Sequence, residues 1–317
     1  MTSTSAYAPY LQTYGKAVPY LTNDEYQRAP TALDVANLVS GGLQSQQTAL
    51  MESIARASSW IDQYVTNSAY NTLCATSNVE NARVWGNRQG QIIVHPKLWP
   101  ILEVSAFNYS GPGAGFSQTS VTPAGNIWIE PQQFIVQPNA TYSWNTQTYS
   151  NSYSSNPGGA WPVGITTQQY LCEWTYVNGF PNTTTSASVA AGAASISVQS
   201  GIGIYPGTQL TIFDAPLDEV VVVASNYVSG GTVLPLVSPT LYTHEEDRSV
   251  TNLPNAVKQA AILLTSALIK QRGSGALIAQ DMGVISSVDM GKAQGMENDI
   301  ALAKELLANF RQNFIGY

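Results

Sequence analysis

The sequence predicts an α+β fold with a helical core made of N- and C-terminal helices, an antiparallel β domain and a second inserted small β domain. Apolar residues recur at helical spacing near both ends of the 317-residue chain, and short runs of β-branched and aromatic residues lie between them. Neither terminal segment can bury its apolar stripe alone, so we expect the two ends to pack together. The expected segments are an N-terminal arm at 1–29, the helical core at 30–88 and 254–317, the β domain at 89–182 and the inserted β module at 183–253.

Three long helices are expected near the chain ends. The first covers roughly residues 43–66, where apolar side chains return every three or four positions at Leu50, Ile54, Ala57, Ile61 and Val65. The second covers roughly 254–272 and is expected to end at Gly273-Ser274-Gly275. Its apolar stripe is Val257, Ala261, Leu264 and Leu268. The last helix is indicated by Ile300, Ala303, Leu307, Phe310 and Phe314.

The β character of the middle of the chain rests on short apolar runs separated by Gly, Pro and Asn. Between 91 and 180, turn signals such as Gly111-Pro112-Gly113 separate these runs, which is typical of antiparallel strands. In the last run, Tyr170, Trp174 and Tyr176 alternate with more polar residues, so this strand is expected to have one aromatic face. The composition changes after residue 183, which indicates a separate inserted module.

The chain carries few charges. Charged residues make up 10% of the sequence, against about 25% in typical soluble domains, and the net charge is −7. The absence of any Lys/Arg run argues against an electrostatic grip on nucleic acid. We expect no membrane span and no secretory signal, because the apolar stretches are shorter than about 20 residues and residues 1–20 lack a basic start and an apolar segment. A surface rich in Ser, Thr, Asn, Gln and Tyr solvates weakly, so other chains are expected to cover much of it.

The sequence contains few residues that could serve in catalysis or metal binding. The chain has two histidines, and His244-Glu245-Glu246-Asp247 resembles a set of metal ligands only superficially. Adjacent residues on a strand point to opposite faces and do not converge on one ion, so we expect a solvated acidic turn there. A divalent-metal hydrolase is the least favoured of the functional hypotheses. Cys74 and Cys172 are too few for a disulfide framework and are expected to be buried thiols. We therefore expect no enzyme, no cofactor and no metal.

Five tyrosines lie in the N-terminal arm, at Tyr7, Tyr10, Tyr14, Tyr20 and Tyr26. Tyrosine offers a large contact area at low entropy cost and is enriched at protein interfaces. Two interpretations stay open: the arm lies on another chain, or its tyrosines pack on the core of this chain.

Three stretches resemble a known protein family. The first runs from Tyr20 to Thr31 and leads to Ile54–Asp62. The second pairs Val94–Val104 with Tyr176–Asn182, and the third joins Ala191–Val198, Pro206-Gly207 and Glu219–Val223. In this order they resemble the head-to-tail adaptor proteins of tailed bacteriophages, the connector family whose helical core carries a β insertion. The resemblance covers most of residues 20–315, and the module at 183–253 is an addition that smaller adaptors lack.

The resemblance implies a homo-oligomeric ring, commonly of twelve subunits, in the head-tail neck of the virion, assembled in the host cytoplasm. Such a ring binds the portal protein on one side and a stopper or tail-completion protein on the other. Genomic DNA passes through its lumen during ejection without sequence-specific binding, and a chain poor in Lys and Arg suits such a conduit. Portal docking is expected at Phe314, Ile315 and Tyr317. Packing between subunits is expected on the helices, at Leu50, Ile54, Trp60, Ile61, Leu264, Leu268, Leu307 and Phe310.

A second hypothesis treats the chain as a surface adhesin or carbohydrate-binding β module. It rests on the aromatic face of Tyr170, Trp174 and Tyr176 and on the polar stretch Asn145–Ser155. Sugars stack on exposed aromatic rings, so this hypothesis requires the three rings to face solvent. The helical ends of the chain have no role in it.

Overall fold

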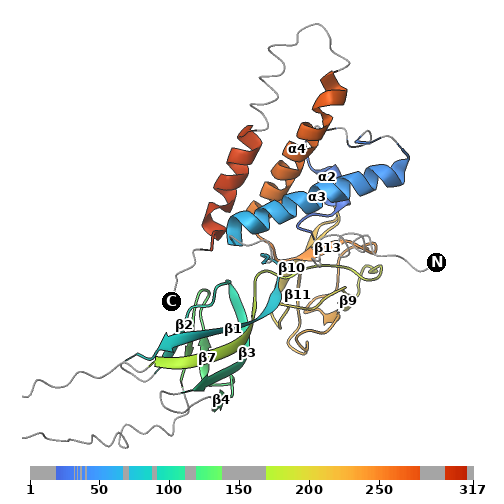
Figure 1. The fold of residues 1–317 in the computed structure, drawn as a ribbon. Helices are drawn as coiled ribbons and strands as arrows, with labels where there is room; N and C mark the ends of the chain where they lie inside the picture. Colours follow the sequence, from blue (N-terminus) through green and yellow to red (C-terminus); the bar gives the residue numbers. More distant parts are fainter. Residues whose placement is uncertain are drawn as a thin grey trace, which may run out of the picture. The chain divides into compact units, whose positions relative to one another are not determined.

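The computed structural model describes residues 19–31, 33, 35, 38, 39, 41–66, 71–87, 91–110, 119–137, 169–278 and 297–312, with the side chains of 272–278 left out (Figure 1). Contacts within the chain divide it into two compact units. The mixed unit, which contains helices and sheets, comprises Met1–Thr76 and Phe180–Asn313. The β unit comprises Ser77–Gly179 and Phe314–Tyr317.

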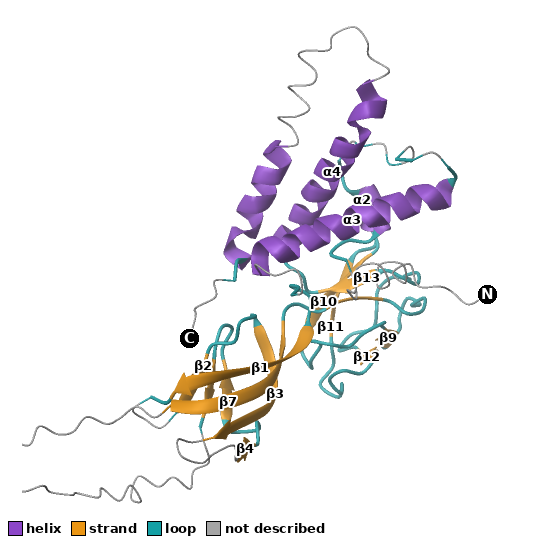
Figure 2. Ribbon diagram, viewed as in Figure 1, coloured by secondary structure: helices purple, strands orange, loops and turns teal. Residues whose placement is uncertain are grey.

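The expected fold class is wrong. Among the described residues, thirteen strands form four antiparallel sheets, against four α-helices, so antiparallel sheet is the main architecture (Figure 2). Even the segment 30–88, expected to be helical, contains the ten-residue strand β1 (Thr76–Trp85). The cause is the unequal strength of the two signals. A long amphipathic helix repeats its pattern many times, whereas eight of the thirteen strands have three residues each and show almost no period.

All helices in the described ranges belong to the mixed unit. They are α2 (Asn23–Arg28), α3 (Leu43–Thr66), α4 (Asn255–Ile278) and a helix at 297–307, which is followed by the 3₁₀ turn η2 (Ala308–Phe310). The helix expected at 43–66 is confirmed as α3, and α4 packs against it (Figure 1). α4 continues through Gly273-Ser274-Gly275, which were expected to end it. A glycine inside a helix costs about 1 kcal/mol relative to alanine, which does not by itself end the helix.

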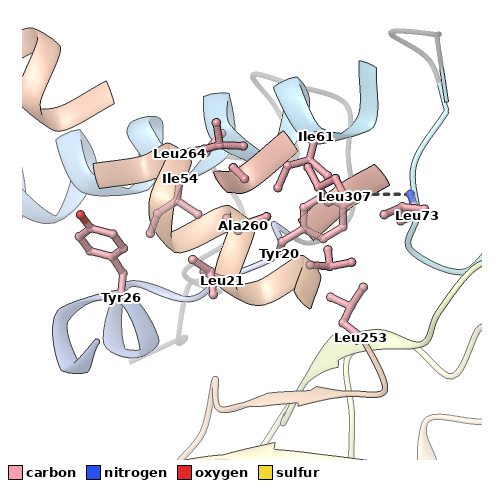
Figure 3. Close-up of a cluster of buried hydrophobic side chains, with 14 of the residues drawn as sticks. Tyr20, Leu21, Tyr26, Ile54, Ile61, Leu73, Leu253, Ala260, Leu264 and Leu307 are labelled. Carbon is pink, nitrogen blue, oxygen red and sulfur yellow. Dashed lines mark hydrogen bonds between the residues drawn. The ribbon is translucent and has the colours of Figure 1, made fainter. Parts of the chain in front are cut away.

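One apolar core joins these helices (Figure 3). The predicted stripe of α3, from Leu50 to Val65, is buried, and it meets α4 at Ala260, Ala261 and Leu264 and the last helix at Ala303 and Leu307. Tyr20 and Tyr26 are buried in the same core, so these two arm tyrosines pack on their own chain. Tyr7, Tyr10 and Tyr14 lie outside the described residues.

The Tyr20 side chain ties three segments of the core together. Its hydroxyl hydrogen-bonds the Asp62 carboxylate of α3, lies 3.1 Å from Thr72 Oγ1 and accepts the Leu73 N–H at 2.9 Å (Figure 3). Burial and then the negative charge of Asp62 raise the pKa of Tyr20 well above its ordinary value. The phenol therefore stays protonated and donates to Asp62, whose buried carboxylate needs a donor.

The inserted β module completes the mixed unit. Its strands are β8 (Asn182–Thr184), β9 (Ser195–Ser197), β10 (Gln209–Phe213), β11 (Glu219–Val222), β12 (Val233–Pro235) and β13 (Ser249–Thr251). They form an antiparallel sheet in the order β11-β10-β13-β8 and a two-stranded sheet of β12 and β9. A separate apolar cluster, which includes Ile196, Leu210, Ile212 and Val250, fills this module.

The β unit contains the other seven strands, β1 to β7. After β1 they are β2 (Ile92–Val94), β3 (Ile101–Ser110), β4 (Thr119–Val121), β5 (Ile127–Ile129), β6 (Phe134–Val136) and β7 (Gln169–Asn178). Their orders are β1-β7-β3-β4 and β2-β6-β5. Both sheets contribute to one core, in which Trp174 of β7 lies opposite Phe107 of β3 and edge-on to Phe134 of β6.

The two cysteines are expected to differ in reactivity. Cys172 is buried in the β unit, and burial raises the pKa of its thiol to about 12, whereas Cys74 is only partly buried. At pH 8, Ellman's reagent should therefore leave Cys172 unmodified in the native chain and react with it after denaturation. In the Cys74→Ser variant, the native protein should release no thionitrobenzoate and the denatured protein one equivalent. Release from native Cys74→Ser protein would contradict the burial of Cys172.

Candidate subunit interface on the helical layer

Most of the residues expected to pack between subunits are already buried within one chain. Leu50, Ile54, Ile61, Leu264 and Leu307 lie in the helical core. Their side chains stabilise the fold and leave almost no surface for a neighbour. Trp60, Leu268 and Phe310 are only partly buried against this core. Of the eight expected residues, these three alone retain surface that another molecule can contact.

An apolar groove lies where Trp60 and Leu268 reach the surface. Its volume is about 330 Å³, and it is bounded by α3, α4 and the helix at 297–307. Its lining consists of Arg56, Ala57, Trp60, Leu264, Ala267, Leu268, Gln271 and Ile300. We call this feature the helical groove. Because Ala57 and Ala267 have small side chains, the two helices leave a hollow between the larger Trp60 and Leu268 side chains.

Stacking contacts fix one wall of the helical groove. Trp60 and Tyr64, four residues apart on α3, stack with ring centroids 5.1 Å apart and planes 9° from parallel. The Arg311 guanidinium lies over the Tyr64 ring, 5.1 Å from its centroid. Such contacts between aromatic rings and with a cation restrict side-chain rotation. The groove can therefore receive apolar side chains without first ordering this wall.

The groove has the composition of a binding surface for another protein. Arg56 is the one charged residue of its lining, and it lies 4.0 Å from Glu52 on the same helix. Neither a carboxylate pair nor a nucleophile with its base lines it, so it offers no acid–base chemistry. Phe314, Ile315 and Tyr317, where portal docking was expected, lie outside the described residues.

A second notable feature is a buried ion-pair network between α2 and the β module. Arg248 lies 2.9 Å from Asp24 of α2 and 3.1 Å from Asp214, and it also pairs with Glu245. Asp214 in turn lies 3.2 Å from Nδ1 of the fully buried His244. The other ring nitrogen, Nε2, lies 3.5 Å from the carboxylate of Glu219.

Near this network, Lys258 of α4 forms a further ion pair with α2. Its ammonium group pairs with Glu25 and lies 3.8 Å from the centroid of the Phe213 ring in the β module. Glu25 is held in place because it forms a capping box with Thr22 at the start of α2. Together, these contacts fix the β module against α2 and α4.

No family model, curated protein or solved structure matches this chain. The helical groove and the ion-pair network are therefore interpreted from their own chemistry. Across the described part of the chain, every helix falls short of the length and apolarity that crossing a membrane requires.

The expected solvated turn at His244–Asp247 is wrong for its histidine. Glu245 and Glu246 are exposed, but His244 is fully buried between two carboxylates. Within the described ranges, no three His, Cys, Asp or Glu side chains are placed to hold a metal ion. Sequence reasoning missed the network because its members are far apart in the chain. One signal in the sequence could have pointed to it. In a chain with so few charged residues, Arg248 and the nearby carboxylates are natural candidates for an ion pair.

The aromatic face proposed for carbohydrate binding is also wrong. Trp174 and Tyr176 are buried in the core of the β unit, and Tyr170 packs against that core. The Tyr176 hydroxyl donates to Glu80 at 2.6 Å. The alternation along β7 was read correctly, but the aromatic side faces inward. A sugar therefore cannot stack on the buried Trp174 and Tyr176 rings, which removes the aromatic face that the hypothesis requires.

Proposed function

We propose that this chain is a non-enzymatic structural subunit of a head-to-tail connector ring in the neck of a tailed bacteriophage virion. The ring docks below the portal protein, carries a stopper or tail-completion protein on its other side and forms part of the conduit for genomic DNA. The observation that carries the proposal is the helical groove, an apolar hollow that a single chain leaves open. Surfaces of this kind mark protein interaction sites.

The composition of the chain supports the same proposal. Only 10% of the residues are charged, and Lys and Arg together number 13. Uncharged surface suits burial between neighbouring subunits and between successive rings of a neck. A lumen poor in Lys and Arg holds DNA phosphates weakly, which allows the genome to slide. The ring itself, and its size of about twelve subunits, come from the family resemblance of the sequence.

The proposal predicts a ring of defined mass. Full-length protein, alone or mixed with its portal protein, should form a closed homo-oligomer in native mass spectrometry and a ring in negative-stain electron microscopy. The Trp60→Ala variant should raise the protein concentration needed for half-assembly about tenfold or more, because it removes a large apolar anchor from the groove. The matched control is Trp128→Ala, since Trp128 is an exposed side chain of the β unit. A chain that stays monomeric with and without portal would contradict the proposal.

A further inference from the structure

The β module concentrates the exposed apolar surface of the chain. Sixteen large apolar side chains are exposed among the described residues, and eight of them lie between 202 and 242. Five of these eight are close in sequence to β11 or to the segment that follows β12. We call this set the apolar ridge: Leu217, Val220, Val237, Leu241 and Tyr242.

Hydrogen bonds place the two halves of the ridge side by side. The Val237 N–H donates to the Val222 carbonyl at 2.9 Å, so the segment after β12 runs along β11. Farther on, the Leu241 and Tyr242 N–H groups donate to Oε2 of Glu219, at 2.8 and 3.3 Å. Glu219 directly precedes Val220. The ridge is therefore a surface built on an ordered strand and a segment bonded to it.

The apolar residues of the ridge are exposed for a structural reason. Along β11 the side chains alternate, so Glu219 and Val221 face inward while Val220 faces out, 64% exposed. Leu241 is 73% exposed, and its backbone N–H is held by the Glu219 carboxylate, which His244 also contacts. The buried Glu219 and His244 side chains thus lie directly beneath this exposed apolar surface. Exposed apolar residues gathered on an ordered support are typical of a docking surface.

Charge complementarity identifies what the ridge fits. Between residues 183 and 247 the sequence has six carboxylates and no Lys or Arg. Three of these carboxylates, Asp218, Glu245 and Glu246, are exposed close to the ridge in sequence. The helical groove differs in charge, since its single charged lining residue is the cation Arg56, which lies 4.0 Å from Glu52, and its α4 wall has no acidic residue. The same chain thus carries an apolar surface with nearby carboxylates and an apolar groove that carries a cation.

We propose that the apolar ridge of one copy inserts into the helical groove of the next copy. The inference rests on the proposed ring function and names the two surfaces that close the ring. A head-to-tail contact requires two different complementary patches on each chain, and both patches here lie in the mixed unit. Leu241 and Val220 occupy the groove beside Trp60, and an exposed carboxylate of the β module pairs with Arg56. The occupant of the groove is therefore a second copy of this chain.

The test compares assembly of full-length variants under conditions where the wild-type chain forms its ring. Leu241→Asp places a charge in the contact and should raise the concentration for half-assembly about a hundredfold. The melting temperature should stay unchanged, because Leu241 is 73% exposed in its own chain. Val79→Asp is the matched control, since Val79 is a similarly exposed apolar residue of the β unit. It should assemble like wild type.

Cross-linking tests the geometry directly. After mild oxidation in the Cys74→Ser background, the double variant Leu241→Cys/Leu268→Cys should give a ladder of covalent oligomers, and each single variant should give none. A covalent dimer from Leu241→Cys alone would indicate contact between two ridges and would overturn the proposal. Loss of portal or stopper binding by Leu241→Asp rings of wild-type stability would also overturn it, because the ridge would then face a different protein.

The outcomes separate this inference from the proposed function. If the wild-type chain forms rings and Leu241→Asp leaves them intact, the ridge-to-groove contact is wrong and the ring function stands. If the wild-type chain forms no ring with or without portal, the ring function fails and the contact fails with it. Rescue of an assembly-deficient Arg56→Glu variant by Glu246→Lys would support the charge pairing between copies.

Discussion

Replacing Arg248 with alanine is expected to lower the free energy of unfolding of the mixed unit by about 3–5 kcal/mol. The guanidinium is 15% exposed and lies against Asp24, Asp214 and Glu245. Without it, the buried Asp214 loses its guanidinium partner and keeps the contact with Nδ1 of His244. Breaking a buried ion pair costs this much because the remaining charge stays out of water without a counterion.

The consequence should be local to the joint between α2 and the β module. Hydrogen–deuterium exchange read by mass spectrometry should show faster exchange in α2 and in β10 to β13, while β3 and β7 of the β unit keep their protection. Guanidinium denaturation gives the loss in free energy. If the ridge depends on this joint, the same variant should also weaken ring assembly.

Arg28→Ala is the matched control for Arg248→Ala. Arg28 pairs with the same carboxylate, since its Nε lies 3.1 Å from Asp24, but its side chain is 39% exposed and the pair is of the i, i+4 type. Exposed pairs of this type contribute about 0.3–0.5 kcal/mol. Equal losses in the two variants would show that burial does not decide the strength of the network.

The sequence predicted the long helices well for a physical reason. Each apolar residue of the α3 stripe, from Leu50 to Val65, lies within one regular element, so local spacing is enough to find it. The same reasoning failed for the fold class, because the sheets of this chain are assembled from short strands distant in sequence. β8 pairs with β13, for example, across more than sixty residues. No local pattern contains that pairing.

The candidate site was predictable only in part. Spacing placed Trp60 and Leu268 on helices that pack together, but it did not show that Leu50, Ile54 and Leu264 would be sealed inside one chain while Trp60 stayed partly exposed. That division depends on where the last helix crosses α3 and α4. The apolar ridge was missed because Val220 belongs to a run of four valines, in which inward and outward residues have the same chemistry.

Replacing Trp174 with alanine is expected to destabilise the β unit by about 3–5 kcal/mol, because it leaves a large cavity. Trp174 is 1% exposed, lies opposite Phe107 on β3 and meets Phe134 with ring centroids 6.1 Å apart. These contacts join its two sheets, so no nearby side chain can fill the space without breaking the pairing. Exchange protection should fall in β3, β6 and β7 and stay unchanged in α3 and α4, which belong to the other unit.

The Trp174→Phe variant separates packing from polarity at the same position. The indole Nε1 is buried with no hydrogen-bond partner among the described residues. An unsatisfied buried donor costs about 1–3 kcal/mol, so its removal should offset much of the smaller cavity that phenylalanine leaves. We expect Trp174→Phe to lose less than half of what Trp174→Ala loses, and Trp128→Ala, at a site 76% exposed, to change stability by no more than about 0.5 kcal/mol. Equal losses for the phenylalanine and alanine variants would mean that the indole N–H is bound in the folded protein and contributes as much as the ring.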